Sequence, residues 1–103
     1  MTIKYTFFIG LNDKESHLQE IDTITAGKIV QRVFTSHECG ATITSGQGVY
    51  VHDDGSVVAE NTIIVQVYEF SPVPVNDICR DLKALLNQES IAVEKTDTNS
   101  QLY

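Results

Sequence analysis

The chain has 103 residues, of which 42% are hydrophobic and 20% charged, so it is long enough for one domain with a single core. Seven basic and fourteen acidic residues give a formal net charge of −7, which disfavours direct binding to nucleic acid or to an anionic membrane. The first residues do not form a signal peptide, no run is apolar enough for a membrane helix, and the two cysteines form no CxxC motif. We therefore expect a cytoplasmic protein, in the host cell if a phage encodes it.

The N-terminal third predicts a strand, a loop and a helix. Apolar residues alternate with others from Ile3 to about Leu11, the period of a strand with one buried face. The polar segment from Asn12 to Gln19 is expected to be a loop. Asp22 or Thr23 is a suitable N-cap for the helix that follows, in which the apolar positions have the i, i+3, i+4 spacing of an amphipathic helix.

The middle of the chain predicts a β-hairpin. Two β-rich runs, about Ala41 to His52 and Val57 to Phe70, flank the turn residues Asp53-Asp54-Gly55. The segment Ser45 to Gly48 within the first run predicts a bulge or a close backbone approach. A phosphate-binding loop is the alternative for these glycines, but neither a helix N-terminus nor a lysine follows them.

The last third predicts a second helix and a final strand. Two prolines in Ser71 to Pro74 end the hairpin, because proline cannot donate to a strand ladder. A helical apolar stripe then runs from Val75 to Asn87 or Gln88, with Asn76 or a preceding residue as its cap. The last strand is expected from Ser90 to about Thr96. We expect one domain over residues 1–97 and a polar tail over residues 98–103.

The order of elements, βαββαβ, predicts an α+β fold of the ferredoxin-like type. Right-handed crossovers would place both helices on one face of a four-stranded antiparallel sheet, with the first and third strands in the centre. The other face would carry Phe8, Ile64 and Tyr68, with Tyr50 also a candidate. Because three or four large apolar groups would form an uncovered patch, Phe8, Ile64 and Tyr68 are predicted to form a homo-oligomer interface. A ligand, another partner or the folded-over tail are the alternatives.

Residues suited to catalysis are sparse. Two short clusters could each offer two metal ligands: His37-Glu38-Cys39 and His52-Asp53-Asp54. Neither has the spacing of a structural zinc site, so we expect no metal or other cofactor. Cys39 near His37 is the one local nucleophile pair, at an unsuitable helix end. Glu60 and Asp54 could form a carboxylate pair across the hairpin, although an exposed charge pair is the simpler interpretation. These observations predict that the protein is not an enzyme.

Three segments carry a family resemblance: KYTFFIGLNDK (Lys4 to Lys14), GVYVHDDGSVVAENTIIVQV (Gly48 to Val67) and LKALLNQESIAVE (Leu82 to Glu94). They resemble a family of small, uncharacterised ferredoxin-like proteins of bacteria and their phages. The shared features are a first strand ending in Gly, a DG hairpin followed by an acidic residue, and an NQES turn into the last strand. These features are structural, so the resemblance implies a fold and no catalytic residues. By analogy, the compact acidic chain is similar to phage accessory proteins that counter bacterial immunity.

We therefore expect a non-enzymatic binding protein that inhibits bacterial immunity, with a nucleotide signal or a host defence protein as its partner. Nucleotide capture needs cations for phosphate and aromatic surfaces for stacking. The chain offers six candidate ligand-binding residues for this purpose: Lys28, Arg32, Tyr50, His52, Tyr68 and Arg80. One alternative is an acidic, anti-CRISPR-like inhibitor that uses the −7 charge to engage a basic groove. The other alternative is a small dimeric ferredoxin-like enzyme.

Overall fold

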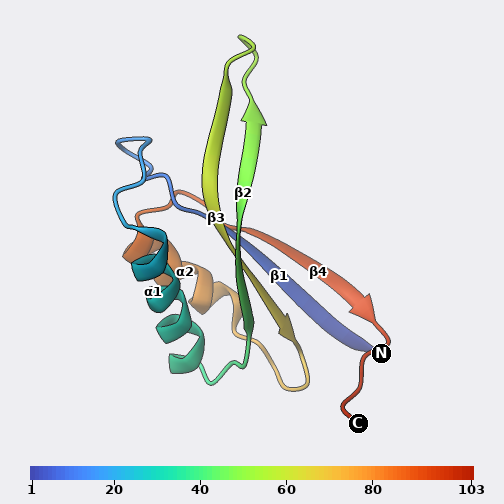
Figure 1. The fold of residues 1–103 in the computed structure, drawn as a ribbon. Coiled ribbons are helices and arrows are strands. Elements are labelled where there is room, and N and C mark those ends of the chain that lie inside the picture. Colours follow the sequence, from blue (N-terminus) through green and yellow to red (C-terminus); the bar gives the residue numbers. More distant parts are fainter.

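The computed structural model describes residues 1–103 and has the expected ferredoxin-like fold. The antiparallel sheet has the strand order β2-β3-β1-β4, which confirms that the first and third strands are central. Figure 1 shows both helices on one face of the sheet and the hairpin of β2 and β3 projecting beyond them. The elements in chain order are β1 (Thr2–Gly10), α1 (Thr23–Ser36), β2 (Thr42–Val51), β3 (Val57–Tyr68), α2 (Val75–Leu86) and β4 (Ala92–Thr98).

The core lies between the helices and the central strands. Phe7 of β1 meets Phe34 of α1 edge to face, with ring centroids 5.1 Å apart, and both side chains are fully buried. A cluster of 13 buried residues is completed by the apolar stripes of both helices and by five further residues: Ile9, Leu11, Ile63, Val65 and Val67. Burial of these side chains is the main stabilising contribution to the fold, because each large apolar side chain contributes roughly 1.5–3 kcal/mol.

The helix ends follow local capping chemistry, with one difference from the sequence prediction. Asp22 caps α1 by accepting a hydrogen bond from the Thr25 N–H at 2.8 Å, as expected. At α2, however, Asn76 already lies inside the helix, and Pro74 stands at the N-cap without a side-chain hydrogen bond. Asn87 ends α2 in the left-handed conformation, with a φ of 49°, which Asn tolerates better than most residues.

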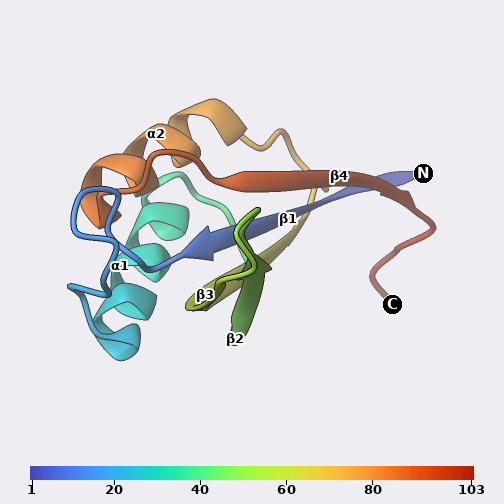
Figure 2. The ribbon, with the colours of Figure 1, turned by 90° about the horizontal axis from the view of Figure 1, so that it is seen from above.

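The face of the sheet opposite the helices, here called the open face, carries the even-numbered residues of β1 and β3. Phe8 pairs directly with Ile64, and Lys4 pairs with Tyr68, so all four residues are on this face. Phe8 is 39% exposed and Tyr68 is 44% exposed, while Ile64 is half-buried. Apolar side chains therefore remain uncovered in the centre of the sheet. Figure 2 shows the fold from above, with α1 and α2 on the same side of the strands.

The bulge predicted in β2 is absent. The pairing of β2 with β3 runs without interruption from Thr42 opposite Gln66 to Val51 opposite Val57. The glycine at position 48 instead makes room for a side chain, because an added Cβ would lie 2.9 Å from the Tyr50 hydroxyl. The close approach at this segment is therefore between the backbone of β2 and an aromatic ring. Neither helix is long and apolar enough to cross a membrane.

Candidate functional site

A groove of about 650 Å³ opens at one end of the open face. It lies between the hairpin and the loops that follow β1 and α2, and its lining reaches Tyr50 and His52 beside the hairpin turn. Phe8 and Gly10 contribute from β1, Tyr50 from β2, Glu60 from β3 and Ala92 from β4, so every strand of the sheet lines it. Its volume is within the range of about 300–1,000 Å³ that is usual for small-molecule sites.

The fold holds the Glu60 carboxylate of this groove in place. Its Oε2 atom accepts a hydrogen bond from the backbone N–H of Asn12 at 2.9 Å. The carboxylate lies directly over Gly10, where an added Cβ would be 2.6 Å from Glu60 Oε2. The pairing with Asp54 proposed from the sequence is wrong, since Glu60 is opposite Gly48 and Asp54 lies in the hairpin turn.

Hydrogen bonds tie together the two loops that form one wall of the groove. Asp13 accepts a hydrogen bond from the Asn87 side chain at 2.7 Å, and the Lys14 N–H donates to the Asn87 carbonyl at 3.0 Å. The bond from Asn87 is the main cause that lowers the pKa of Asp13, so this carboxylate is charged near neutral pH. On the same wall, the Gln88 side chain donates to the Asn12 carbonyl at 2.8 Å. Residues about 75 positions apart in sequence thus form one fixed surface.

The groove is acidic with an aromatic side. Asp13, Glu60 and Glu89 supply carboxylates, while Lys14 is the one lysine or arginine that lines it. Phe8 and Tyr50 supply aromatic surface. This combination suits a ligand with a planar apolar part and a positive charge, and it disfavours a polyphosphate.

The structure brings together two of the six candidate ligand-binding residues. Tyr50 and His52 both line the groove, whereas Lys28, Arg32, Tyr68 and Arg80 do not. The fold also separates these residues from one another. Lys28 and Arg32 lie on α1, whereas Tyr68 is the last residue of β3. Tyr68 stacks on Phe70 there, with ring centroids 6.0 Å apart.

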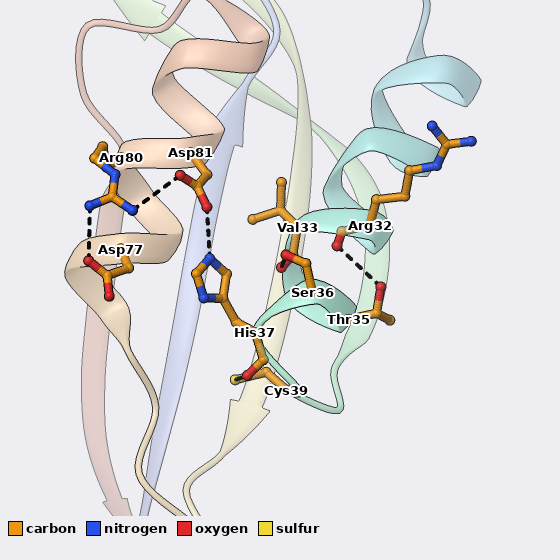
Figure 3. A network of polar contacts seen from close by, with 9 residues as sticks. All are labelled: Arg32, Val33, Thr35, Ser36, His37, Cys39, Asp77, Arg80 and Asp81. Carbon is orange, nitrogen blue, oxygen red and sulfur yellow. Dashed lines mark hydrogen bonds and ion pairs between the residues drawn. The ribbon is translucent and has the colours of Figure 1, made fainter.

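Arg80 and Arg32 lie on the helical side of the molecule. Arg80 of α2 donates hydrogen bonds to Asp77 at 3.1 Å and to Asp81 at 3.4 Å. Figure 3 shows the Arg32 guanidinium pointing away from this group. The two arginines therefore do not converge on one phosphate position.

His37 and Cys39, considered from the sequence as a nucleophile pair, have other partners. The His37 Nε2 atom lies 2.7 Å from Asp81 Oδ2, which joins the end of α1 to α2 (Figure 3). This hydrogen bond is the main cause that lowers the pKa of Asp81. The Cys39 thiol donates to the His37 backbone carbonyl at 3.6 Å, and burial raises its pKa. A raised pKa disfavours the thiolate, so Cys39 is a poor nucleophile.

Sequence reasoning missed most of the groove. The sequence marks Gly10 only as the end of a strand and Glu60 only as an acidic residue of the hairpin. It places Asn12, Asp13 and Gln88 in loops or at a helix end and predicts no role for them. The NQES turn and the NDK segment, which carried the family resemblance, contain several of these residues and were the available signal.

Comparison with known proteins identifies the fold. No family model matches the chain, and no curated protein matches it. Among solved structures, a phage SAM lyase in complex with S-methyl-5′-thioadenosine is similar, with a TM-score of 0.66, 19% sequence identity and coverage of 93% of this chain and 81% of that chain. The GlnK–ATP complex of B. subtilis has a TM-score of 0.57 at 12% identity, covering 92% of this chain and 84% of that chain. CutA1 from Pyrococcus horikoshii has a TM-score of 0.53 at 16% identity, covering 99% of this chain and 87% of that chain.

These similarities correct the expectation that the chain is not an enzyme. That expectation was based on the absence of an acid–base pair or an activated nucleophile, and a lyase is among the proteins with this fold. The absence of such a pair therefore does not decide whether the fold is catalytic. At identities below 20%, the comparisons show the fold alone.

Proposed function

We propose that the groove binds S-adenosylmethionine and that the protein is a lyase that cleaves it to S-methyl-5′-thioadenosine. The observation that carries this proposal is the Glu60 carboxylate, which is fixed over Gly10 in an acidic, aromatic-sided groove of nucleoside size. A phage SAM lyase with the same fold, described in complex with S-methyl-5′-thioadenosine, supports the choice of substrate.

The charge of the groove favours this substrate over a nucleotide. S-adenosylmethionine carries a positive sulfonium, which the carboxylates of Asp13, Glu60 and Glu89 attract. A nucleoside triphosphate would bring several negative charges to the same carboxylates, with Lys14 as the one lysine opposing them. The sequestration of a nucleotide signal is therefore the weaker hypothesis for this site.

The chemistry of a sulfonium lyase fits a site without an acid–base pair. When the C–S bond breaks, its electron pair goes to sulfur, which becomes a neutral thioether and needs no proton. A lyase adds no water. Instead, an oxygen of the substrate's own α-carboxylate attacks the carbon next to the sulfur and forms a C–O bond as the C–S bond breaks, so the products are the neutral thioether and a lactone. The protein then has to hold the substrate in a reactive conformation, which is a matter of positioning.

Glu60 is assigned the role of holding the ribose. An acidic side chain accepts hydrogen bonds from ribose hydroxyls in dinucleotide-binding folds, and a carboxylate has two oxygens for this purpose. The Asn12 N–H donates to Oε2, so Oε1 remains free to accept a hydrogen bond. Tyr50 would supply the apolar surface against the base.

The biological consequence and the assembly are proposed together with this activity. Removal of a methyl donor in an infected cell would deprive methyl-transferring enzymes of their substrate, which agrees with a phage counter-defence role. We also propose that a second copy of the chain covers Phe8, Ile64 and Tyr68 on the open face, because Phe8 and Tyr68 are exposed there and no helix covers this face.

The test is direct. The purified protein is incubated with S-adenosylmethionine, and S-methyl-5′-thioadenosine is quantified by liquid chromatography and mass spectrometry. Glu60→Gln should lower kcat/KM by roughly 10–100-fold, since a hydrogen bond to a charged group contributes about 1.5–3 kcal/mol. Glu94→Gln is the matched control, because Glu94 lies on the same face opposite Thr6 and outside the groove. No product above the buffer background, or equal losses in both variants, would contradict the proposal.

A further inference from the structure

Gln88 is a nearly buried polar side chain in the wall of the groove. Only 8% of the residue is exposed, and it is one of three buried polar residues of the chain. It follows the left-handed Asn87 at the end of α2, and its backbone N–H donates to the Lys83 carbonyl at 3.0 Å. The end of the helix therefore fixes the backbone from which this side chain extends.

The hydrogen bonds of Gln88 fix which way its amide faces. The Nε2 atom donates to the Asn12 carbonyl at 2.8 Å and to the Leu86 carbonyl at 3.3 Å. Because a carbonyl only accepts hydrogen bonds, the nitrogen must face these two groups and the oxygen must face away from them. Both amide hydrogens are then committed to the protein.

The amide oxygen of Gln88 has no donor within the chain. It accepts no hydrogen bond from any group of the chain. Every side-chain oxygen that is sealed from solvent, however, has a hydrogen-bond partner. The Gln88 oxygen is thus open to solvent, and Gln88 lines the groove. A nearly buried residue with one unused acceptor on a ligand-sized groove is suited to recognise a hydrogen-bond donor.

We propose that Gln88 Oε1 selects for an amino group of the bound ligand; this inference rests on the lyase activity proposed above. The oxygen can accept from an N–H group but repels a carbonyl oxygen, so it would distinguish an amino group from an oxo group at the same position. A site built to pair with an N–H group rejects an analogue without it, because the buried acceptor is then left unpaired. S-adenosylmethionine offers two such donors, which are the 6-amino group of adenine and the α-ammonium group.

Two ligand pairs distinguish these donors. For the adenine amino group, calorimetry compares the binding of S-methyl-5′-thioadenosine with that of S-methyl-5′-thioinosine, which has an oxo group in its place. For the α-ammonium group, the KM of S-adenosylmethionine is compared with that of its analogue lacking the α-amino group. We expect the wild-type protein to prefer the amino form by at least about 5-fold in one pair, because the acceptor is left unpaired by the other form.

The preference ratio separates recognition from a structural role. Gln88→Ala should bring the ratio of that pair close to one, even if the loss of its bonds to Asn12 and Leu86 weakens both ligands. For the adenine pair, Asp13→Ala is the control, because it removes the tie to Asn87 on the same wall and should weaken both ligands while keeping the ratio. A wild-type ratio near one in both pairs, with product still formed, would overturn the role of Gln88 alone. The absence of both binding and product would overturn the lyase proposal and this inference with it.

Discussion

The Glu60 carboxylate occupies the space that a side chain at Gly10 would fill. The two residues lie on the neighbouring central strands, and the Asn12 N–H, two residues beyond Gly10, donates to the same carboxylate at 2.9 Å. Glycine at position 10 is therefore explained by the need for room above the strand, since its φ is not positive. The position of this acidic group depends on a residue that has no side chain of its own.

Gly10→Ala should lower activity far more than stability. The added Cβ would overlap the end of the Glu60 side chain, which can swing aside at little cost to the fold. Displacement of a positioning group by about 1 Å can cost on the order of 100-fold in rate. We expect a melting temperature close to wild type in thermal denaturation and a large loss of S-adenosylmethionine cleavage. Gly27→Ala is the control, because nothing lies near its Cβ position and alanine favours the helix. A loss of stability as large as the loss of activity would contradict this explanation.

Val65→Asp should unfold the domain, whereas Lys4→Glu should not. Val65 is fully buried in the core, and an unpaired charge there costs several kcal/mol, roughly half or more of the stability of a small domain. Lys4 is on the open face and is only half-buried. Urea titration followed by circular dichroism should show a folded Lys4→Glu protein and an unfolded Val65→Asp protein. Equal destabilisation would mean that the two faces of the sheet are assigned incorrectly.

Ile64→Lys should give a folded protein of lower mass. Ile64 lies opposite Phe8 in the centre of the open face, so a lysine there would place a charge in the proposed contact between copies. Light scattering coupled to size-exclusion chromatography measures the change in mass. Thr96→Lys, on the same face of the edge strand β4, is the comparison. A wild-type protein that is monomeric at high concentration would refute the proposed assembly.

The sequence predicted what local periodicity and turn chemistry determine. The alternation of Ile63, Val65 and Val67 assigned the buried face of β3, and Asp53-Asp54-Gly55 located the hairpin. The groove was not predictable in the same way, because it depends on contacts between distant residues. The partner of Glu60 is the backbone of Asn12, 48 residues away, and no pattern of side chains records a bond to a backbone N–H. The tie between Gln88 and Asn12, separated by 76 residues, is of the same kind.

The pH dependence of stability should include a contribution from the cap of α1. The Thr25 backbone N–H is the main cause that lowers the pKa of Asp22 below its usual value of 3.8, and the Thr25 hydroxyl adds to it. A carboxyl group whose pKa is lowered by folding contributes stability that is present above its unfolded pKa and is lost as the pH falls through the folded one. Asp22→Ala should therefore lower the melting temperature at pH 7, and the difference from wild type should shrink below about pH 4. Asp22→Asn, which caps without titrating, should stay close to wild type at pH 7. A difference between wild type and Asp22→Ala that is constant down to pH 2 would contradict this assignment.

The acidity of the groove should determine which adenosine compounds bind. S-methyl-5′-thioadenosine has no phosphate, so we expect it to bind more tightly than ATP in calorimetry. Glu89→Lys should improve the binding of ATP by roughly 30-fold, because it removes a repulsive charge and adds an attractive one, at about 1 kcal/mol for each. Glu38→Lys makes the same change in net charge beyond the end of α1, outside the groove, and should leave ATP binding nearly unchanged. Equal improvement in both variants would assign the effect to the net charge of −7 rather than to the groove. Tighter binding of ATP than of S-methyl-5′-thioadenosine by the wild-type protein would instead favour a nucleotide-binding function over the lyase.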